Sequence, residues 1–195
     1  MGAPSAVSLF VRPAGRDRTL LGQIMGAAFF CALTALGAQV KVPLPWTDVP
    51  MTLQPLPVLL AGLLLTPGVA ASSMLLYAGV GAAGLPVFTP GSAGIFGPTG
   101  GYIVGFVAGA GLVGLLRGGA GAGLYRLATA GFAGMLCVFA FGLAWRTVLF
   151  GGDLAAAVAT GLLPFVAKAI VEVLLAAAMA RQIHRAFGGA VEKSV

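Results

Sequence analysis

Long stretches without a charged residue constrain the fold of this chain more than any other feature. The first, Leu20 to Val40, contains no Asp, Glu, Lys or Arg, and as a helix it is long enough to cross about 30 Å of hydrocarbon. Apolar residues make up 59% of the sequence and charged residues only 8%, against roughly a quarter in soluble domains. So few charges do not cover the surface of a soluble protein. We therefore expect an integral membrane protein.

The net charge of +6 does not indicate nucleic-acid binding, because the basic residues are scattered between apolar runs rather than gathered into a stripe. Cys31 and Cys137 lie inside apolar runs without a CxxC spacing, so we interpret them as inert buried thiols. Residues 1–19 are polar, and the apolar run that follows is too long for the core of a signal peptide. We expect that run to remain as the first membrane helix.

The pattern predicts an all-α membrane protein, a compact bundle of six transmembrane helices that forms a single domain over residues 1–195. The expected helices are 20–40, 51–65, 69–84, 101–116, 126–150 and 164–184, with a short surface helix at 154–161. The second is short and contains Pro55 and Pro57, so we expect it to be partly re-entrant or short and covered by protein. Residues 85–101 are rich in proline and glycine and are predicted to be non-helical, so protein, water or ligand must satisfy their backbone.

The basic residues predict the orientation of the bundle. Six helices place both termini on one side, and most basic residues fall there, which favours a cytoplasmic location. We therefore expect a cytoplasmic segment at 1–19, the bundle at 20–184 and a cytoplasmic tail at 185–195. The residues on that side are Arg12, Arg16, Arg18, Arg117, Arg126, Arg181, Arg185 and Lys193, whereas Lys41 and Arg146 lie on the other.

Signatures of an enzyme or a metal site are missing from the sequence. The one Lys-Ser pair, Lys193-Ser194, follows Glu192 where a phosphate-binding loop requires glycine. The single histidine, His184, lies among arginines at the expected cytoplasmic end, so neither a histidine metal site nor a Ser–His pair is expected in the membrane. We interpret Ser92 as a turn serine. The prediction is a protein without catalytic residues, metal or cofactor.

Two charged residues lie within the last predicted helix. Lys168 and Glu172 are four residues apart and therefore share one helix face. Charges in a membrane helix are costly and usually face the bundle interior or a wet cavity. The pair either locks helices together as a self-satisfied ion pair or lines a polar ligand site. Arg146 either contributes to that site or extends to the lipid headgroups.

Small residues recur at four-residue spacing in two predicted helices. Gly105 and Gly109 indicate close helix packing, whereas Gly100 and Gly101 open a helix after a non-helical loop and present N–H groups suited to an anionic or carbonyl-bearing ligand. Ala28 and Ala32 form a small-residue stripe. It suits either a partner helix or packing within the chain.

Three motifs resemble those of a known family. They are Val49-Pro50-Met51-Thr52-Leu53-Gln54, then Gly84-Leu85-Pro86-Val87-Phe88 with Gly91, Gly94 and Gly97-Pro98-Thr99-Gly100-Gly101-Tyr102, and Leu163-Pro164-Phe165. This pattern resembles the BioY family, the biotin-specific substrate-binding (S) components of energy-coupling-factor (ECF) transporters. The likeness runs through nearly the whole chain.

The resemblance implies high-affinity biotin capture and uptake across a bacterial cytoplasmic membrane. The chain would be a multi-pass S component of an ECF-type ABC transporter, with a pocket near the outer face and no cofactor. Its partners would be a transmembrane coupling protein and two ATPase subunits, with a homo-oligomer left open and some members thought to lack a complete dedicated set. In the family, small residues on helix one face the coupling protein, and Ala28 and Ala32 match them.

The resemblance also implies which residues bind the substrate. Lys168 would pair with the biotin carboxylate, Gln54 and Thr99 would serve the ureido edge, and Tyr102 and Trp145 would cover the ring. The full implied set is Thr52, Gln54, Gly91, Thr99, Gly100, Gly101, Tyr102, Trp145, Lys168 and Glu172.

The last helix departs from the family pattern. The family reads Pro-Phe-x-Pro-Gly-Asp-x-x-Lys, whereas here Ala169 takes the aspartate place and Glu172 the lysine place. Lys168 and Glu172 would restore an acid and a base in reversed order. The alternatives are an S component for a different vitamin or, on a weaker basis, a small membrane channel or enzyme.

Overall fold

The computed structural model describes residues 20–119 and 121–192. Its α-helices are α1 (Leu20–Gln39), α2 (Pro55–Leu64), α3 (Pro67–Ala82), α4 (Gly100–Leu116), α5 (Leu124–Leu149), α6 (Leu154–Gly161) and α7 (Val166–Glu192). The 3-10 turns η2 (Gly94–Phe96) and η3 (Leu163–Phe165) interrupt the connections before α4 and α7. The predicted segment 1–19, with Arg12, Arg16 and Arg18, lies outside the described residues, as does Lys193.

The prediction of a helical membrane bundle is confirmed. Within the described residues, three helical stretches are long and apolar enough to cross a membrane: Leu20–Gln39, Leu124–Leu149 and Leu154–Ala186. Helices α2, α3 and α4 are apolar but shorter. Many large apolar side chains are exposed on the outside of the bundle, among them Leu36, Leu75 and Leu136, as expected where lipid replaces water.

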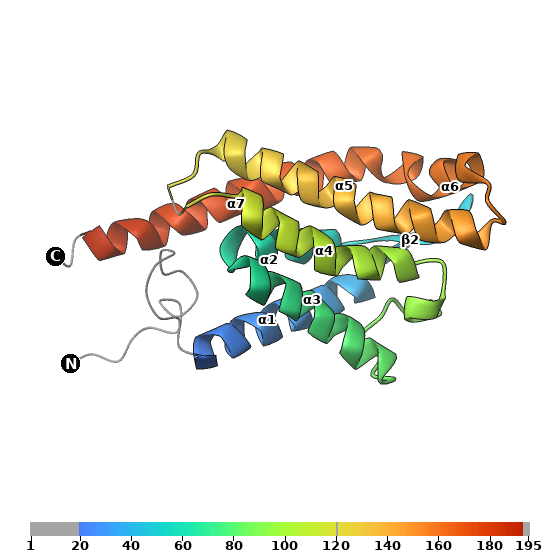
Figure 1. Cartoon of the computed structure of the whole chain (residues 1–195), viewed down its shortest axis with the longest axis horizontal. Coiled ribbons are helices and arrows are strands. Elements are labelled where there is room, and N and C mark those ends of the chain that lie inside the picture. The colour runs from blue at the N-terminus through green and yellow to red at the C-terminus, as the bar shows by residue number, and fades with distance from the viewer. Residues whose placement is uncertain (1–19, 120, 193–195) are drawn as a thin grey trace.

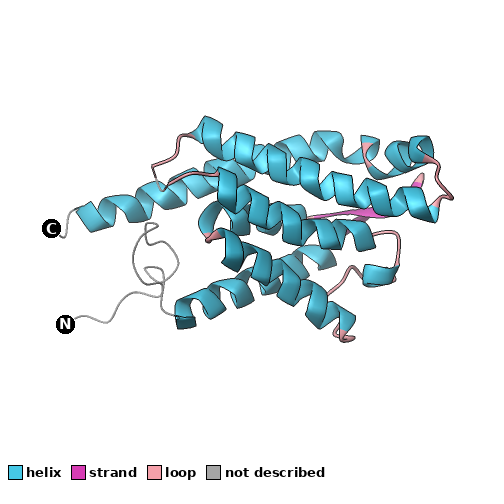
Figure 2. Ribbon diagram, viewed as in Figure 1, coloured by secondary structure: helices cyan, strands magenta, loops and turns pink. Residues whose placement is uncertain are grey.

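Two elements differ from the prediction. Residues Lys41–Leu44 form strand β1 and Thr47–Thr52 form strand β2, which pair antiparallel with Lys41 opposite Thr52. The sequence predicts a loop here, because the strands are short and each holds one proline, which hides their alternation. The last helix continues to Glu192 rather than ending near His184, since no proline follows. Figure 2 shows the strands as the one magenta feature among cyan helices.

Helix α2 lies in the core. Its residues from Pro57 to Leu63 are all buried, and it packs against α4 and α7. A proline opens the helix, where the missing N–H has no cost. The prediction of a short second helix covered by protein is confirmed, but the predicted start at Met51 is wrong: the helix begins at Pro55, because Met51 and Thr52 pair in strand β2.

The two ends of the bundle are built differently. In Figure 1, the start of α1, the α2–α3 turn, the α4–α5 loop and the end of α7 lie at the left, which we call the terminal end. At the other end, which we call the hairpin end, lie β1 and β2, the irregular segment 83–99 and α6. Residues 83–99 are non-helical apart from η2, as the sequence predicts.

Candidate ligand pocket

A cavity with about 680 Å³ of empty space, part of it open to solvent, lies toward the hairpin end. Its walls come from the hairpin, α2, α3, the 83–99 segment, α4, α5, η3 and α7. The lining residues are Val49, Pro50, Thr52, Gln54, Pro55, Tyr77, Phe88, Thr89, Ser92, Thr99, Tyr102, Ile103, Phe106, Met135, Val138, Phe139, Phe165, Lys168, Ala169 and Glu172.

Six of the residues expected to bind substrate lie together on this wall, although they come from distant parts of the chain. They are Thr52, Gln54, Thr99, Tyr102, Lys168 and Glu172. The other four are not among the described residues that line the cavity. They are Gly91, Gly100, Gly101 and Trp145.

The Gln54 side chain joins three segments at the hairpin end. Its amide nitrogen donates a hydrogen bond of 2.7 Å to the Tyr77 hydroxyl on α3. Its amide oxygen accepts hydrogen bonds from Thr52 at 3.0 Å and from Thr89 at 3.2 Å. Both lone pairs of that oxygen are thus used within the chain, and one amide N–H remains for a ligand. Gln54 therefore mainly links the segments that form the cavity wall through hydrogen bonds.

Sequence reasoning missed Tyr77, Phe88 and Thr89. The Tyr77 hydroxyl donates to the Val87 carbonyl at 3.3 Å, and its ring packs edge-on against Phe88 with centroids 5.4 Å apart. These contacts hold the 83–99 segment on α3. A buried hydroxyl in an apolar helix needs a hydrogen-bond partner. The tyrosine at position 77 is therefore the feature of the sequence that could have indicated this part of the cavity wall. Ser92 lies in a turn, as predicted, and accepts from the Gly94 N–H at 3.3 Å.

Lys168 and Glu172 form an ion pair across one turn of α7. The Lys168 Nζ lies 2.6 Å from Glu172 Oε2, and both side chains line the cavity. Because both residues belong to α7, the pair does not lock two helices together. Glu172 Oε1 is buried and has no hydrogen-bond partner among the described residues. The pair therefore offers unused donors on Lys168 and an unused acceptor on Glu172.

Tyr102 forms a fixed part of the cavity wall. Its hydroxyl donates to the Gly161 carbonyl at 2.7 Å. Its ring lies so close to α5 that a Cβ on Gly142 would come within 2.3 Å of it. The Tyr102 hydroxyl proton thus points to α6, and the residue presents mainly its apolar ring to a ligand.

The start of α4 is used for packing. A Cβ on Gly101 would come within 2.5 Å of the Phe141 carbonyl oxygen. The N–H groups of Gly100 and Tyr102 are hydrogen-bonded to Gly97 and Thr99, so these two do not await a ligand. Trp145 donates its indole N–H to the Gly97 carbonyl at 3.0 Å, which holds the loop before α4 against α5.

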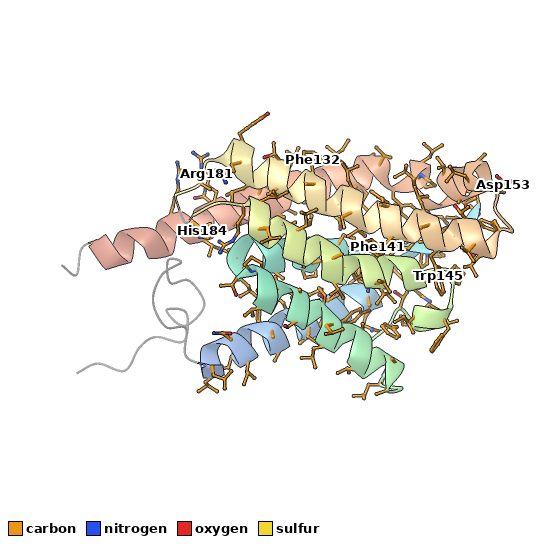
Figure 3. The ribbon with its side chains drawn as sticks, in the orientation of Figure 1. Phe132, Phe141, Trp145, Asp153, Arg181 and His184 are labelled. Carbon is orange, nitrogen blue, oxygen red and sulfur yellow. The ribbon has the colours of Figure 1, made fainter. Side chains whose placement is uncertain are left out.

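Arg146 neither lines the cavity nor extends to the lipid headgroups, which are the two roles that the sequence suggests. Its guanidinium contacts Asp48 at 2.8 Å and Thr160 at 2.7 Å and lies over the Phe150 ring, 4.9 Å from its centroid. Only 1% of the side chain is exposed, so it does not extend to the headgroups. It is also absent from the cavity lining. In Figure 3, Trp145 and Asp153 mark this end of the bundle, opposite Arg181 and His184.

The small-residue stripe lies on the surface. Ala28 and Ala32 are exposed and line a groove between α1 and α3 together with Leu36, Leu76 and Val87. Among the described residues, no group of three or more His, Cys, Asp and Glu side chains is placed to hold a metal ion.

The fold and the pocket define a class of protein: a helical membrane bundle that encloses a mostly apolar cavity with a few polar anchors, as small-ligand sites are built. The sequence model of the BioY family matches residues 12–189. The chain belongs to the BioY family.

Relatives of known name agree with this assignment. The chain is 38% identical over 160 residues to a probable biotin transporter BioY of Pyrococcus horikoshii, covering 80% of this chain and 93% of that protein. It is 33% identical over 166 residues to the biotin transporter BioY of Thermotoga maritima, covering 84% and 96%. These relatives are named as transporters and not as enzymes.

A solved structure shares the fold. The crystal structure of the S-component for biotin from an ECF-type ABC transporter superposes with a TM-score of 0.77 and covers 88% of this chain and 95% of that one, at 21% identity. This likeness confirms the predicted helical fold.

Proposed function

We propose that this chain captures biotin in the cavity at the hairpin end and is the substrate-specific subunit of an ECF-type transporter. The observation that carries the proposal is the composition of the cavity wall. Aromatic and aliphatic side chains surround one ion pair, Lys168–Glu172, and one amide, Gln54. The names of the relatives support the same ligand.

The chemistry of biotin fits this wall. Biotin has an apolar fused ring, a ureido group with two N–H donors and one acceptor, and a carboxylate tail. The rings of Phe88, Phe106 and Tyr102 suit the apolar part. Lys168 uses one of its three N–H donors on Glu172, and we assign a remaining donor to the carboxylate. We assign the ureido edge to the free Gln54 N–H and the Thr99 hydroxyl.

The hairpin end would face the outside, and the terminal end the cytoplasm. The described basic residues support this orientation, since Arg117, Arg126, Arg181 and Arg185 lie toward the terminal end. The coupling protein would pack on the Ala28–Ala32 groove, and two ATPase subunits would supply the energy. We propose a bacterial cytoplasmic membrane, a single membrane domain and no cofactor beyond the ligand, with a homo-oligomer as a further possibility to test.

Calorimetric titration of the purified chain in detergent with biotin, without nucleotide, tests the function. We expect saturable binding, and a competing panel of other vitamins should not displace biotin. If another vitamin displaces biotin, the proposed ligand is wrong and that vitamin takes its place in the assignment. No binding by a well-folded sample would refute capture by this chain alone.

The Lys168 assignment is tested by a cycle of two ligands and two proteins. Biotin methyl ester lacks the carboxylate charge, so it should bind the wild-type chain more weakly than biotin by about tenfold, as for a lost charge-assisted hydrogen bond of about 1.5 kcal/mol. In Lys168→Ala the two ligands should bind with equal affinity. If the ester penalty persists in Lys168→Ala, the carboxylate lies elsewhere.

A further inference from the structure

Arg146 is buried at the hairpin end beside the pocket, yet it does not line it. Only 1% of its side chain is exposed, whereas its partner Asp48 is 50% exposed. A buried guanidinium is costly unless it is paired and hydrogen-bonded. Three groups contact the guanidinium, and they come from three elements: Asp48 on β2, Thr160 on α6 and the Phe150 ring after α5.

We propose that Arg146 is a positioning residue for the ligand site: through Asp48 and Thr160 it fixes the β1–β2 hairpin as a wall that retains the ligand. This inference rests on the proposed function, since the ligand tested is biotin. Arg146 acts through the hairpin and not by contact with the ligand.

The hairpin needs such an anchor because two strands alone have little stability in water. Strand β2 contributes Val49, Pro50 and Thr52 to the cavity wall. Its far end is held by the Thr52–Gln54 hydrogen bond. Its near end is held at Thr47, which donates to the Thr160 carbonyl at 2.8 Å, and at Asp48.

Helix α6, which holds Arg146 through Thr160, also contacts Tyr102, another residue of the cavity wall. Thr160 accepts from Arg146, and the next residue, Gly161, accepts from Tyr102. A Cβ on Gly161 would come within 2.7 Å of Arg146 Cδ and 2.5 Å of the Tyr102 hydroxyl. Tyr102, Gly161 and Arg146 thus pack as one unit, so a shift of the hairpin at Asp48 changes the cavity between Pro50 and Tyr102.

The sharpest test is Asp48→Asn compared with Asp153→Asn. Both replace one carboxylate at the hairpin end by its neutral isostere. Asp153 caps α6 by accepting from the Ala156 N–H at 2.9 Å, and asparagine also caps helices well. Asp48→Asn removes the charge that pairs with Arg146 and leaves the hairpin sequence otherwise intact.

We expect the biotin dissociation rate to rise about tenfold in Asp48→Asn, with the association rate within about twofold of wild type, since loss of a retaining contact acts on dissociation. Asp153→Asn should match wild type. Stopped-flow displacement of bound biotin in nanodiscs measures the dissociation rate, and stopped-flow mixing of biotin with the ligand-free protein measures the association rate. Hydrogen exchange without biotin should show faster exchange of the hairpin amides in Asp48→Asn and unchanged exchange in α4 and α5.

Equal dissociation rates in the two variants would overturn the proposal. So would a faster dissociation with unchanged hairpin exchange, because Asp48 would then act on the ligand path directly. A failure of biotin to bind the wild-type chain would refute the proposed function, whereas hairpin exchange would still report whether Arg146 holds the hairpin.

Discussion

The two ends of the bundle each bury an arginine, but they use it differently. At the hairpin end, Arg146 pairs with the Asp48 carboxylate on a strand that forms part of the cavity. At the terminal end, Arg117 donates to the Leu63 carbonyl at 3.0 Å, and the His184 ring lies 3.2 Å from the same oxygen. The first arginine positions a ligand wall, whereas the second satisfies the end of a buried helix.

The difference follows from the backbone at each end. Helices α2 and α3 are joined at the terminal end by a tight turn between Leu64 and Pro67. The hairpin end holds the hairpin and the 83–99 segment, whose polar groups are satisfied by side chains such as Gln54, Tyr77 and Trp145. Substitutions that move the cavity wall at the hairpin end should therefore alter biotin affinity, and those at the terminal end should alter stability alone.

The largest contrast is expected between Gly101→Ala and Gly114→Ala, both on α4. A Cβ at Gly101 would lie 2.5 Å from the Phe141 carbonyl oxygen of α5, and one at Gly114 would lie 2.8 Å from the Pro67 Cα of α3. Each forces backbones apart, at a cost of about 1–3 kcal/mol in stability. Only Gly101→Ala should also weaken biotin binding, by about tenfold or about 1.4 kcal/mol, because it displaces α4 next to Tyr102.

Thermal unfolding in detergent and biotin titration, run on the same samples, separate these effects. Gly114→Ala is the matched control: it should unfold at a lower temperature and retain wild-type affinity while folded. Equal loss of affinity in both variants would show that the ends do not differ as argued.

Arg117→Met is expected to have a smaller effect. The change keeps an apolar stem but removes a hydrogen bond to the Leu63 carbonyl, which His184 still contacts. Stability should fall by about 1–2 kcal/mol, with the biotin dissociation constant unchanged. The comparison is with Asp48→Asn, where the dissociation rate should rise. A weaker biotin affinity in Arg117→Met would show that the terminal end reaches the pocket.

Much of this fold was predictable because apolar runs and prolines set helix positions directly. The bounds of α1 and α4 follow from uncharged runs that end at charged or helix-breaking residues, and the pairing of Lys168 with Glu172 follows from helical spacing alone. The resemblance to the BioY family predicted which segments line the pocket. Composition alone does not indicate these segments.

The rest depended on contacts between distant residues. Asp48 and Arg146 are 98 positions apart, and no local pattern marks them as partners. The resemblance to the BioY family predicts Gly100, Gly101 and Trp145 as ligand contacts. The structure places them in the α4–α5 packing and the loop before α4, and their part in binding stays a prediction.

The smallest expected effect distinguishes two glycines within α3. A Cβ at Gly81 would come within 2.1 Å of the Phe88 ring, whereas a Cβ at Gly79 would meet no atom within 4 Å. Gly81→Ala should therefore push the Phe88 ring, which lines the cavity, and weaken biotin binding about threefold, or about 0.7 kcal/mol. The Phe88 side chain can turn aside, so stability should change little, because alanine also favours the helix by about 0.5–1 kcal/mol. Gly79→Ala carries the same helical gain without the contact and should bind biotin as wild type. If both variants bind alike, the Phe88 ring does not shape the pocket, and the hairpin end tolerates more movement than its packing indicates.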